Sequence, residues 1–218
     1  VQQFGDYALA LTRHFANGDL DALRGGGDAV FSFNPKVEAM PERLRSIFWV
    51  RNLDRIALLA LLGAAVLARG AAGIFFSVPA TTESLTLPQY ERFMRPFDLA
   101  FLQAIEGRGE CHVLHAHGEH LYFDRLVDYP AHALSWADLN GGPSIADARR
   151  RTRFTLMAGL DHVKFVESSA RLVRGQVTRA LAAGSATGFI LAPGCSLPTY
   201  AYPPLIRAAR EESSKQVG

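Results

Sequence analysis

The chain has few cysteines and no long apolar segment. Cys111 and Cys195 are its only two cysteines, too few for the disulfide framework of a small secreted domain. The most apolar stretch, residues 56–68, is closed by Arg55 and Arg69 and is shorter than the roughly 20 residues that cross a bilayer. The N-terminus also lacks the basic-then-apolar pattern of a signal peptide. We therefore expect a cytoplasmic protein with no membrane partner, in which residues 56–68 form a buried helix.

An excess of charge of either sign is also missing. The net charge is +2, and the basic residues are scattered rather than gathered into a stripe. We therefore expect no nucleic-acid partner, because such proteins carry a clustered basic surface. Of the 218 residues, 49% are hydrophobic and 20% are charged, which is typical of a globular protein with one buried core. No linker or low-complexity stretch interrupts the chain, so residues 1–218 are predicted to form a single domain.

Short apolar runs recur along the chain and alternate with longer segments of helical spacing. The runs lack strict apolar/polar alternation, as is typical of strands that are buried on both faces of a parallel sheet. A helical pattern covers residues 4–15, and another covers 90–105 with Pro88 near its start. Ser168 is the expected N-cap of a further helix, which Gly184 closes. The six predicted strands are residues 29–34, 73–78, 111–117, 131–136, 154–160 and 188–192.

This strict alternation predicts an α/β fold built from a parallel sheet with helical crossovers. An open doubly wound sheet is the alternative, but no glycine-rich phosphate loop follows any predicted strand. We therefore favour a (β/α)8 TIM barrel. About six βα units are present, whereas a closed barrel has eight and typically about 250 residues. The expectation is an incomplete barrel whose N-terminal units are missing from this chain.

Active sites of such barrels lie at the carboxyl ends of the strands. His115 and His117 are two residues apart at the end of one predicted strand, so their side chains share a face. Two imidazoles that project together at a barrel mouth suit a zinc ion, although hydrogen bonding to neighbours is the simpler alternative. In contrast, His112 is expected to point the other way, and His120 lies beyond Gly118 on a loop or helix start.

Cys195 strengthens the case for a metal. It follows the last predicted strand in a Gly-Cys turn, at the same face of the barrel. One thiolate and two imidazoles leave a fourth position open for substrate, which is the pattern of catalytic zinc. Cys111 instead opens its strand and is expected to be a buried core thiol at the opposite end. Phe33, Asn34, Ser77, Trp136 and Asp161 lie at other strand ends and are candidate substrate contacts.

These secondary candidates have structural alternatives. Phe33 and Trp136 could form an apolar floor for a ligand or belong to the core, and Asp161 is better explained as a cap of the following segment. The arginine-rich segment 149–153 is expected to face solvent or to meet Asp147 rather than to bind a ligand.

Several motifs resemble the central part of the uroporphyrinogen decarboxylase superfamily, in that family's order and spacing. The resemblance runs from about Phe31 to Arg210, and Phe-Ile-Leu-Ala-Pro-Gly-Cys-Ser-Leu-Pro at 189–198 is its most specific part. The other matching segments are 114–118, 123–130, 134–136, 143–150 and 157–161.

Two chemistries follow from this resemblance. The true decarboxylases act on uroporphyrinogen without a metal, using arginines, an aspartate and a tyrosine around the tetrapyrrole. The arginine-rich stretch and the aspartate belong to the N-terminal part, which we expect this chain to lack. At the tyrosine's expected position, residues 58–65, this chain has mostly Leu and Ala, and it carries Gly194-Cys195 where decarboxylases have Gly-His.

The other branch comprises corrinoid-linked and coenzyme M methyltransferases, which pair a His-x-Cys-Gly strand with a later Gly-Cys to hold zinc. His115 matches the first of these ligands and Cys195 the last, while His117 stands where the branch usually has Cys. The resemblance thus implies a methyltransferase that moves a methyl group from a corrinoid, carried by a substrate or partner protein, to a thiol. The alternatives are a carboxy-lyase that acts on a tetrapyrrole, and an incomplete barrel without catalytic activity.

Overall fold

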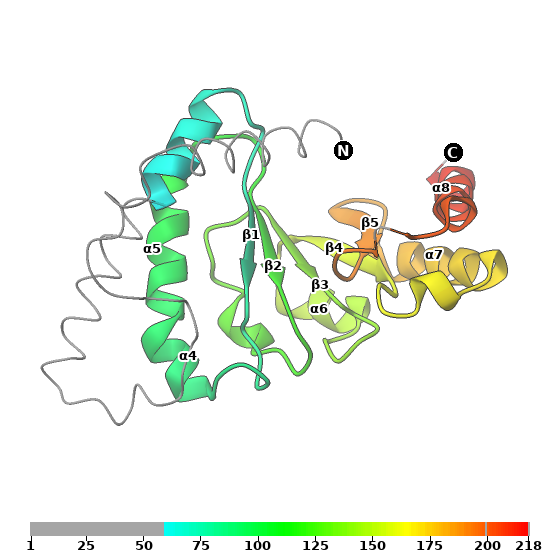
Figure 1. Cartoon of the computed structure of the whole chain (residues 1–218), viewed down its shortest axis with the longest axis horizontal. Coiled ribbons are helices and arrows are strands. Elements are labelled where there is room, and N and C mark those ends of the chain that lie inside the picture. The colour runs from blue at the N-terminus through cyan, green and yellow to red at the C-terminus, as the bar shows by residue number, and fades with distance from the viewer. Residues whose placement is uncertain (1–58, 199, 218) are drawn as a thin grey trace, which may run out of the picture. The chain divides into compact units, whose positions relative to one another are not determined.

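The computed structural model describes residues 59–198 and 200–217. Within them, five strands alternate with helices (Figure 1). Residues 59–68 are helical and precede the first strand. The strands are β1 (Phe75–Val78), β2 (Val113–Ala116), β3 (Ala133–Trp136), β4 (Thr155–Leu160) and β5 (Phe189–Pro193). The labelled helices are α4 (Leu87–Phe93), α5 (Arg95–Ile105), α6 (Ile145–Arg151), α7 (Ala170–Gly184) and α8 (Pro203–Val217), with 3-10 turns η2 (Phe123–Arg125) and η3 (Phe165–Glu167).

The five strands form one parallel sheet in the order β1-β2-β3-β4-β5. Each strand pairs in parallel with the next one along the chain, and a crossover containing a helix or a short 3-10 turn connects them. This sequential order is that of a (β/α)8 barrel, whereas a doubly wound sheet reverses its strand order. The α/β prediction of a partial TIM barrel is therefore confirmed, and five of the six predicted strands are present. The sixth, residues 29–34, and the helix 4–15 lie outside the described residues.

The two faces of the sheet differ in burial. One face packs against the helices, and its residues Leu114, Leu134 and Leu156 are fully buried. The opposite face, which is the inner side in a barrel, is partly open: Phe75 is 51% exposed and Ile190 is 40% exposed. The strand register places Ser77, His115, Ser135 and Met157 in one row across this open face. Three of these residues, Ser77, His115 and Ser135, are polar and lie next to the carboxyl ends of their strands, where a barrel fold binds ligands.

The predicted helix 90–105 is two helices, α4 and α5, and this corrects the expectation of a single one. Met94 lies between them, and Pro96 occupies the first turn of α5. Because proline has no backbone N–H to continue the ladder of α4, the helix ends and restarts there. Pro88 lies in the first turn of α4, as expected, where Thr86 and Gln89 form a capping box.

Helix α7 begins one residue later than expected. The hydroxyl of Ser169 accepts a hydrogen bond from the backbone N–H of Leu172 at 3.2 Å, so Ser169 and not Ser168 is the N-cap. Ser168 instead donates its hydroxyl to the carbonyl of Lys164 at 2.9 Å. The helix ends at Gly184 as predicted, and a Cβ there would lie 2.3 Å from the ring of Phe189. The absence of a side chain at Gly184 lets α7 lie directly against β5.

The helix at residues 59–68 is amphipathic within its described part. Gly63 and Leu67 are buried, whereas Leu59 and Leu61 are 51% and 69% exposed. The expectation of a buried helix is therefore correct for one side only. Among the described residues, no helix combines the length and the apolar character needed to cross a membrane.

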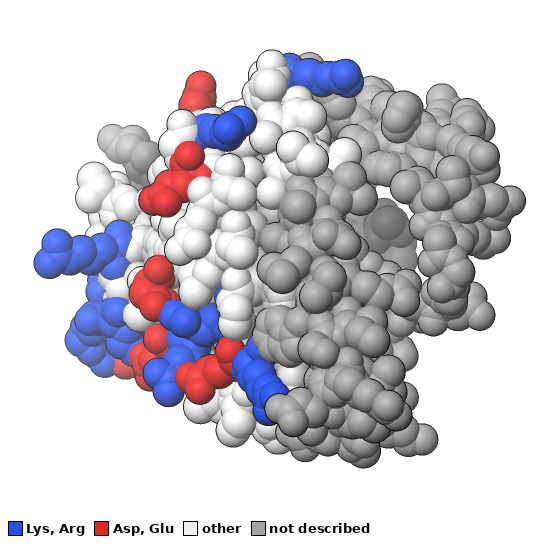
Figure 2. Space-filling view, turned by 90° about the vertical axis from the view of Figure 1, so that its left-hand side faces the viewer, with Lys and Arg blue, Asp and Glu red and all other residues white. Residues whose placement is uncertain are grey.

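Charged side chains of both signs are intermixed on the described part of the face shown in Figure 2. The arginine-rich segment shows the pattern, since Arg150 pairs with Asp147 as expected and Arg151 bonds Asp124 at 2.9 Å. Arg149 has a different role, because it donates hydrogen bonds to the carbonyls of Gly184 and Gly188 at 2.7 and 2.8 Å. It thereby joins α6 to the loop that leads into β5.

Candidate metal centre

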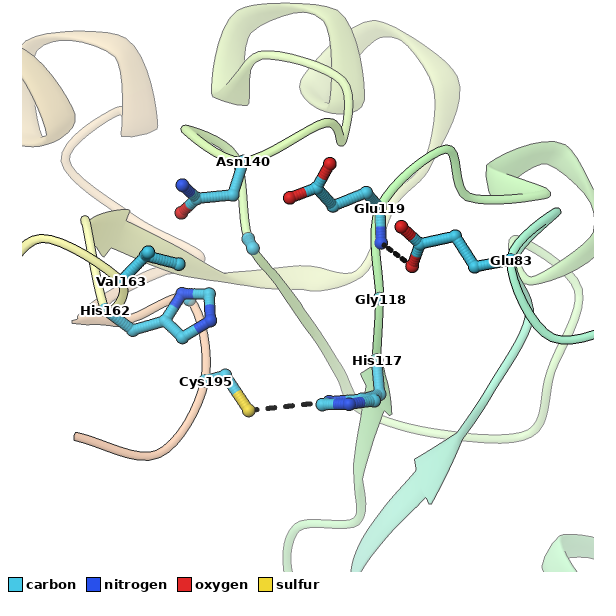
Figure 3. A pocket seen from close by; sticks show the side chains of 10 residues that line it. Glu83, His117, Gly118, Glu119, Asn140, His162, Val163 and Cys195 are labelled. Carbon is cyan, nitrogen blue, oxygen red and sulfur yellow. Dashed lines mark hydrogen bonds between the residues drawn. The ribbon is translucent and has the colours of Figure 1, made fainter. Parts of the chain in front are cut away.

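The loops at the carboxyl ends of all five strands contribute to one site (Figure 3). Each loop brings at least one side chain able to donate or accept a hydrogen bond or to bind a metal. In a parallel sheet with sequential strand order these loops meet at one edge, which explains how residues far apart in sequence become neighbours. The residues are Glu83 after β1, His117 and Glu119 after β2, Asn140 after β3, His162 after β4 and Cys195 after β5.

His115 lies two residues before His117, on β2, and is buried, with only 4% of its surface exposed. Its Nδ1 lies 3.2 Å from the hydroxyl of Ser135 on the adjacent strand, whereas its Nε2 is buried and has no hydrogen-bond partner among the described residues. Burial, with smaller contributions from the charges of His117 and His162, lowers the pKa of His115 from 6.5 to about 4. His115 is therefore neutral near pH 7, which is the form that binds metals.

His117 and Cys195 complete a three-residue group. The Sγ of Cys195 lies 3.5 Å from Nδ1 of His117, and Figure 3 shows the two side chains pointing toward each other. Ligand atoms of His115, His117 and Cys195 all lie within 4.8 Å of one another. Around a tetrahedral zinc ion, a nitrogen and a sulfur ligand are about 3.5 Å apart, given bond lengths of about 2.0 and 2.3 Å. The Cys195–His117 distance thus matches two ligands of one zinc ion, and the three side chains lie close enough together to be candidate ligands of a single ion.

Two cavities adjoin this group, and His117 and Cys195 line both. The larger, of about 430 Å³, lies along the open sheet face and includes Phe75 and Met157. The smaller, of about 210 Å³, is more polar and lies toward the strand-end loops. A metal held by the three residues would therefore be reachable from two sides.

The candidate substrate contacts differ in whether they line one of these cavities. Ser77 lines the larger cavity together with His115. Trp136 lines neither cavity, because its ring is fully buried against Phe123 and its indole N–H donates to the carbonyl of Pro143 at 2.8 Å. Asp161 accepts hydrogen bonds from the backbone N–H groups of residues 163 and 164, which is the capping role considered for it. Phe33 and Asn34 lie outside the described residues.

Cys111 is exposed, and the expectation of a buried core thiol is wrong. Its backbone N–H bonds the carbonyl of Ala72 at 3.0 Å, which places Cys111 in the turn before β2 rather than within the strand. His112 behaves as expected and faces away from the site, where it is 1% exposed and bonds the backbone of Ile74 and Ile105. His120 lies on the loop after β2 with a φ of 47° and is exposed.

Residues not singled out from the sequence also line the site. His162 lies on the same side of the smaller cavity as Cys195, and burial lowers its pKa. Glu83 and Glu119 lie on the opposite side, where a carboxylate oxygen of Glu83 accepts the backbone N–H of Glu119 at 3.1 Å. These residues occur singly at different strand ends, so no local motif marks them. In the sequence, only their position after the predicted strands could have indicated that they line the site.

Comparison with known proteins identifies the family. The family model described as uroporphyrinogen decarboxylase (URO-D) matches residues 53–214, about three quarters of the chain. The chain belongs to the uroporphyrinogen decarboxylase family. The three ligand-type residues of this URO-D domain all lie inside the matched range. No relative matches the chain among curated proteins.

A solved structure shares the fold of this URO-D domain. A methyltransferase from Methanosarcina mazei superposes with a TM-score of 0.64 at 17% sequence identity. The match covers 75% of this chain and 48% of that one, so the URO-D chain spans about half the length of the solved protein. At this level of identity the similarity concerns the fold, which agrees with the sequential parallel sheet.

Proposed function

We propose that this URO-D domain is part of a zinc-dependent methyltransferase that moves a methyl group from a corrinoid to a thiol. The observation that carries the proposal is the group formed by His115, His117 and Cys195, with ligand atoms within 4.8 Å of one another. His115 adds a buried Nε2 that has no partner in the described protein. Burying an imidazole nitrogen without a partner is unfavourable, and a metal ion would provide that partner.

Each residue has a distinct part in this proposal. Ser135 holds the Nδ1 side of His115 and leaves Nε2 directed to the metal. His117 and Cys195 provide the second imidazole and the thiolate at the mouth of the barrel. Zinc bound by three protein ligands keeps one position for an incoming thiol and lowers the pKa of that thiol. The neutral state of His115 near pH 7 means that this ligand needs no deprotonation before metal binding.

The transfer itself would join the thiol to the methyl group. The sulfur–carbon bond forms while the cobalt–carbon bond breaks, the bonding electron pair stays with the corrinoid, and the thiol proton passes to solvent. We propose that the corrinoid arrives on a partner protein, because neither cavity, at about 210 and 430 Å³, can enclose a whole corrinoid. The solved methyltransferase of similar fold supports methyl transfer as the class of reaction.

Decarboxylation of a tetrapyrrole receives less support. Its substrate carries several carboxylates, which arginine or lysine side chains would have to bind. The residues that line the two cavities in the described structure include neither Arg nor Lys. A carboxylate-rich substrate would meet Glu83 and Glu119 there instead.

The test is methyl transfer from methylcobalamin to 2-mercaptoethanol by the zinc-loaded protein, with the methyl thioether measured by mass spectrometry. We expect product with the wild type and with Cys111→Ser, since Cys111 lies outside the site, and a loss of at least about tenfold with Cys195→Ser. If metal-free protein releases carbon dioxide from uroporphyrinogen and the zinc-loaded protein forms no thioether, the proposal of methyl transfer is wrong and decarboxylation is the function.

A further inference from the structure

The pairing of β4 with β5 makes His162 a neighbour of Cys195. The strand register pairs Leu160 with Pro193, and His162 and Cys195 each lie two residues beyond that pair. Both side chains line the smaller cavity, and Figure 3 shows them on the same side of it. His162 thus lies next to the turn that carries a candidate metal ligand, although it belongs to a different loop.

The ring of His162 packs against the glycine that precedes Cys195. A Cβ at Gly194 would lie 3.2 Å from Nδ1 of His162 and 2.6 Å from the Cα of Ala137. The N–H of Gly194 donates to the carbonyl of Leu160 at 3.0 Å, which holds the turn against β4. Because residue 194 has no side chain, the imidazole of His162 can lie directly beside the Gly-Cys turn.

The backbone on both sides of His162 is fixed by hydrogen bonds of Asp161. The carboxylate of Asp161 accepts the N–H groups of residues 163 and 164 at 3.0 and 3.1 Å. Its own N–H donates to the side-chain oxygen of Gln176 in α7 at 3.1 Å. The loop therefore presents the imidazole in one place before any ligand arrives.

The two ring nitrogens of His162 have different surroundings. Nδ1 is buried and has no hydrogen-bond partner among the described residues. Nε2 is not one of these buried atoms, and it forms no hydrogen bond with a described residue, so it is accessible at the cavity wall. In a neutral ring that carries its proton on Nδ1, Nε2 is an acceptor open to a molecule in the cavity.

Other titratable groups surround the ring. Burial has the strongest effect on the pKa of His162 and lowers it; the neighbouring Asp161 raises it, His117 lowers it and Glu119 raises it. The net shift is downward, so the ring is neutral near pH 7 and free to take a proton.

The carboxylates of the cavity are less suited to that task. Glu83 and Glu119 lie on the opposite side from Cys195, and Glu83 already accepts the backbone N–H of Glu119. A proton acceptor works best when its pKa is near the working pH, and an imidazole is closer to neutrality than a carboxyl group.

We propose that His162 accepts the proton of the thiol that binds beside Cys195. This inference rests on the proposed function, because it assigns a proton acceptor to the reaction at the candidate metal centre. The S–H bond breaks, its electron pair stays on sulfur, and the proton joins Nε2 of His162, from which it passes to solvent. His162 is not itself a metal ligand in this account, since the group of described residues close enough to share an ion consists of His115, His117 and Cys195.

The test follows thiol binding to cobalt-loaded protein, without any methyl donor, by stopped-flow absorbance at pH 7. Cobalt replaces zinc as a probe because a new cobalt–thiolate bond raises the charge-transfer absorbance. The two probes are 2-mercaptoethanol, whose thiol is mostly protonated at this pH, and thioacetate, which is already ionised. We expect His162→Gln to slow the binding of 2-mercaptoethanol at least about tenfold and to leave thioacetate within about twofold of the wild type. Added imidazole should restore the rate for 2-mercaptoethanol in His162→Ala.

The matched control is His120→Asn, which removes an exposed imidazole on the loop after β2, outside the lining of both cavities. Asparagine tolerates the positive φ of 47° at this position, and we expect wild-type rates for both thiols. Equal slowing of both thiols by His162→Gln, or slowing of neither, would overturn the inference alone. Loss of bound cobalt in that variant would also overturn it, because His162 would then be a ligand. Cobalt-loaded wild type that binds neither thiol would contradict the proposed function and this inference together.

Discussion

The three candidate ligands differ in how firmly the protein holds them. His115 is buried and hydrogen-bonded to Ser135, so its ring is fixed before any metal arrives. His117 is exposed and Cys195 is partly exposed, and they contact each other across the site. A site with one fixed and two accessible ligands combines a preset geometry with an open route for the ion and for a thiol.

Ser135 provides a test at the scale of single residues. Ser135→Ala removes the hydroxyl that holds Nδ1 of His115, and we expect zinc affinity to fall about 10- to 100-fold. Competition with a fluorescent chelator measures the dissociation constant. The matched control is Ser77→Ala, since Ser77 pairs with His115 in the strand register from the other side without a hydrogen bond to its ring. Equal zinc affinity for the Ser135 variant and the wild type would show that the hydroxyl does not position the imidazole.

The sequence indicates the candidate ligand residues more readily than the residues around them. His115, His117 and Cys195 are recognisable because two lie in a His-x-His motif and the third follows a strand in a Gly-Cys turn. His162 has no such motif, and its proximity to Cys195 arises only from the pairing of β4 with β5. The sequence also does not predict that Cys111 is exposed. The predicted strand begins at residue 111, whereas β2 begins at Val113, so Cys111 lies before the strand.

At the scale of the elements, glycine allows the close packing behind the site. Gly159 in β4 has a φ of +125°, and a Cβ there would lie 2.6 Å from the Cβ of Ala180 in α7. Its N–H donates to Asp138 at 2.9 Å, and its carbonyl accepts from Arg179 at 2.8 Å. Gly159 thus joins the loop after β3, β4 and α7 next to the strand ends that carry the candidate metal ligands.

We expect Gly159→Ala to lower the free energy of unfolding by about 2–5 kcal/mol, because strained backbone and overpacking add. Denaturation in guanidinium chloride measures the change. The control is Gly175→Ala within α7, where a Cβ meets no atom within 4 Å and the higher helix propensity of alanine should stabilise by up to about 1 kcal/mol. Similar stabilities for both variants would contradict this account of the packing.

A buried acid links α4 and α5 to the loop before β3. Asp98 is 5% exposed, and it accepts a hydrogen bond from the hydroxyl of Tyr129 at 3.1 Å and a weaker one from Tyr90. Burial raises the pKa of Asp98 from 3.8 to about 7, although the two tyrosines and Arg95 favour the carboxylate. Burial also raises the pKa values of both tyrosines. The cluster therefore holds Asp98 largely protonated in the folded state below about pH 7.

The direction of the pH effect follows from that shift. A carboxyl whose pKa is raised on folding contributes stability that is fully present below its unfolded pKa, near 4, and that is lost as the pH rises through about 7. The free energy of unfolding of the wild type should thus fall between pH 5 and pH 8 relative to Asp98→Asn. Urea denaturation at both values measures this. Glu106→Gln, at an exposed position, should keep the wild-type pH profile, and an Asp98→Asn profile parallel to the wild type would exclude Asp98 as the cause.

The element-level predictions succeed where burial patterns decide the structure. All five strands within the described residues coincide with predicted apolar runs, because buried parallel strands need apolar side chains on both faces. Boundaries are less predictable. The break at Met94 depends on the missing N–H of Pro96, and the choice of Ser169 over Ser168 depends on which hydroxyl meets the third N–H of α7. Hydrophobic periodicity contains neither piece of information.

At the scale of the whole molecule, the sequential parallel sheet brings five loops to one edge and thereby creates the site. Within the described five-stranded sheet, the inner face is partly exposed, with Phe75 51% exposed and Ile190 40% exposed. The fold class and the mouth of the barrel were predictable from the alternation of strands and helices. The two cavities and the acidic lining were not, because they depend on how the loops after β1 and β2 meet.

The most direct test of the central claim is the zinc content of the purified protein. We expect one zinc ion per chain in the wild type and in Cys111→Ser, and at least about a tenfold weaker zinc affinity in Cys195→Ser. X-ray absorption at the zinc edge should show one sulfur neighbour at about 2.3 Å and nitrogen neighbours at about 2.0 Å, with the sulfur lost in Cys195→Ser. A wild-type protein that binds no zinc, or a Cys195→Ser variant that binds it with unchanged affinity and spectrum, would contradict the claim that His115, His117 and Cys195 form a metal centre.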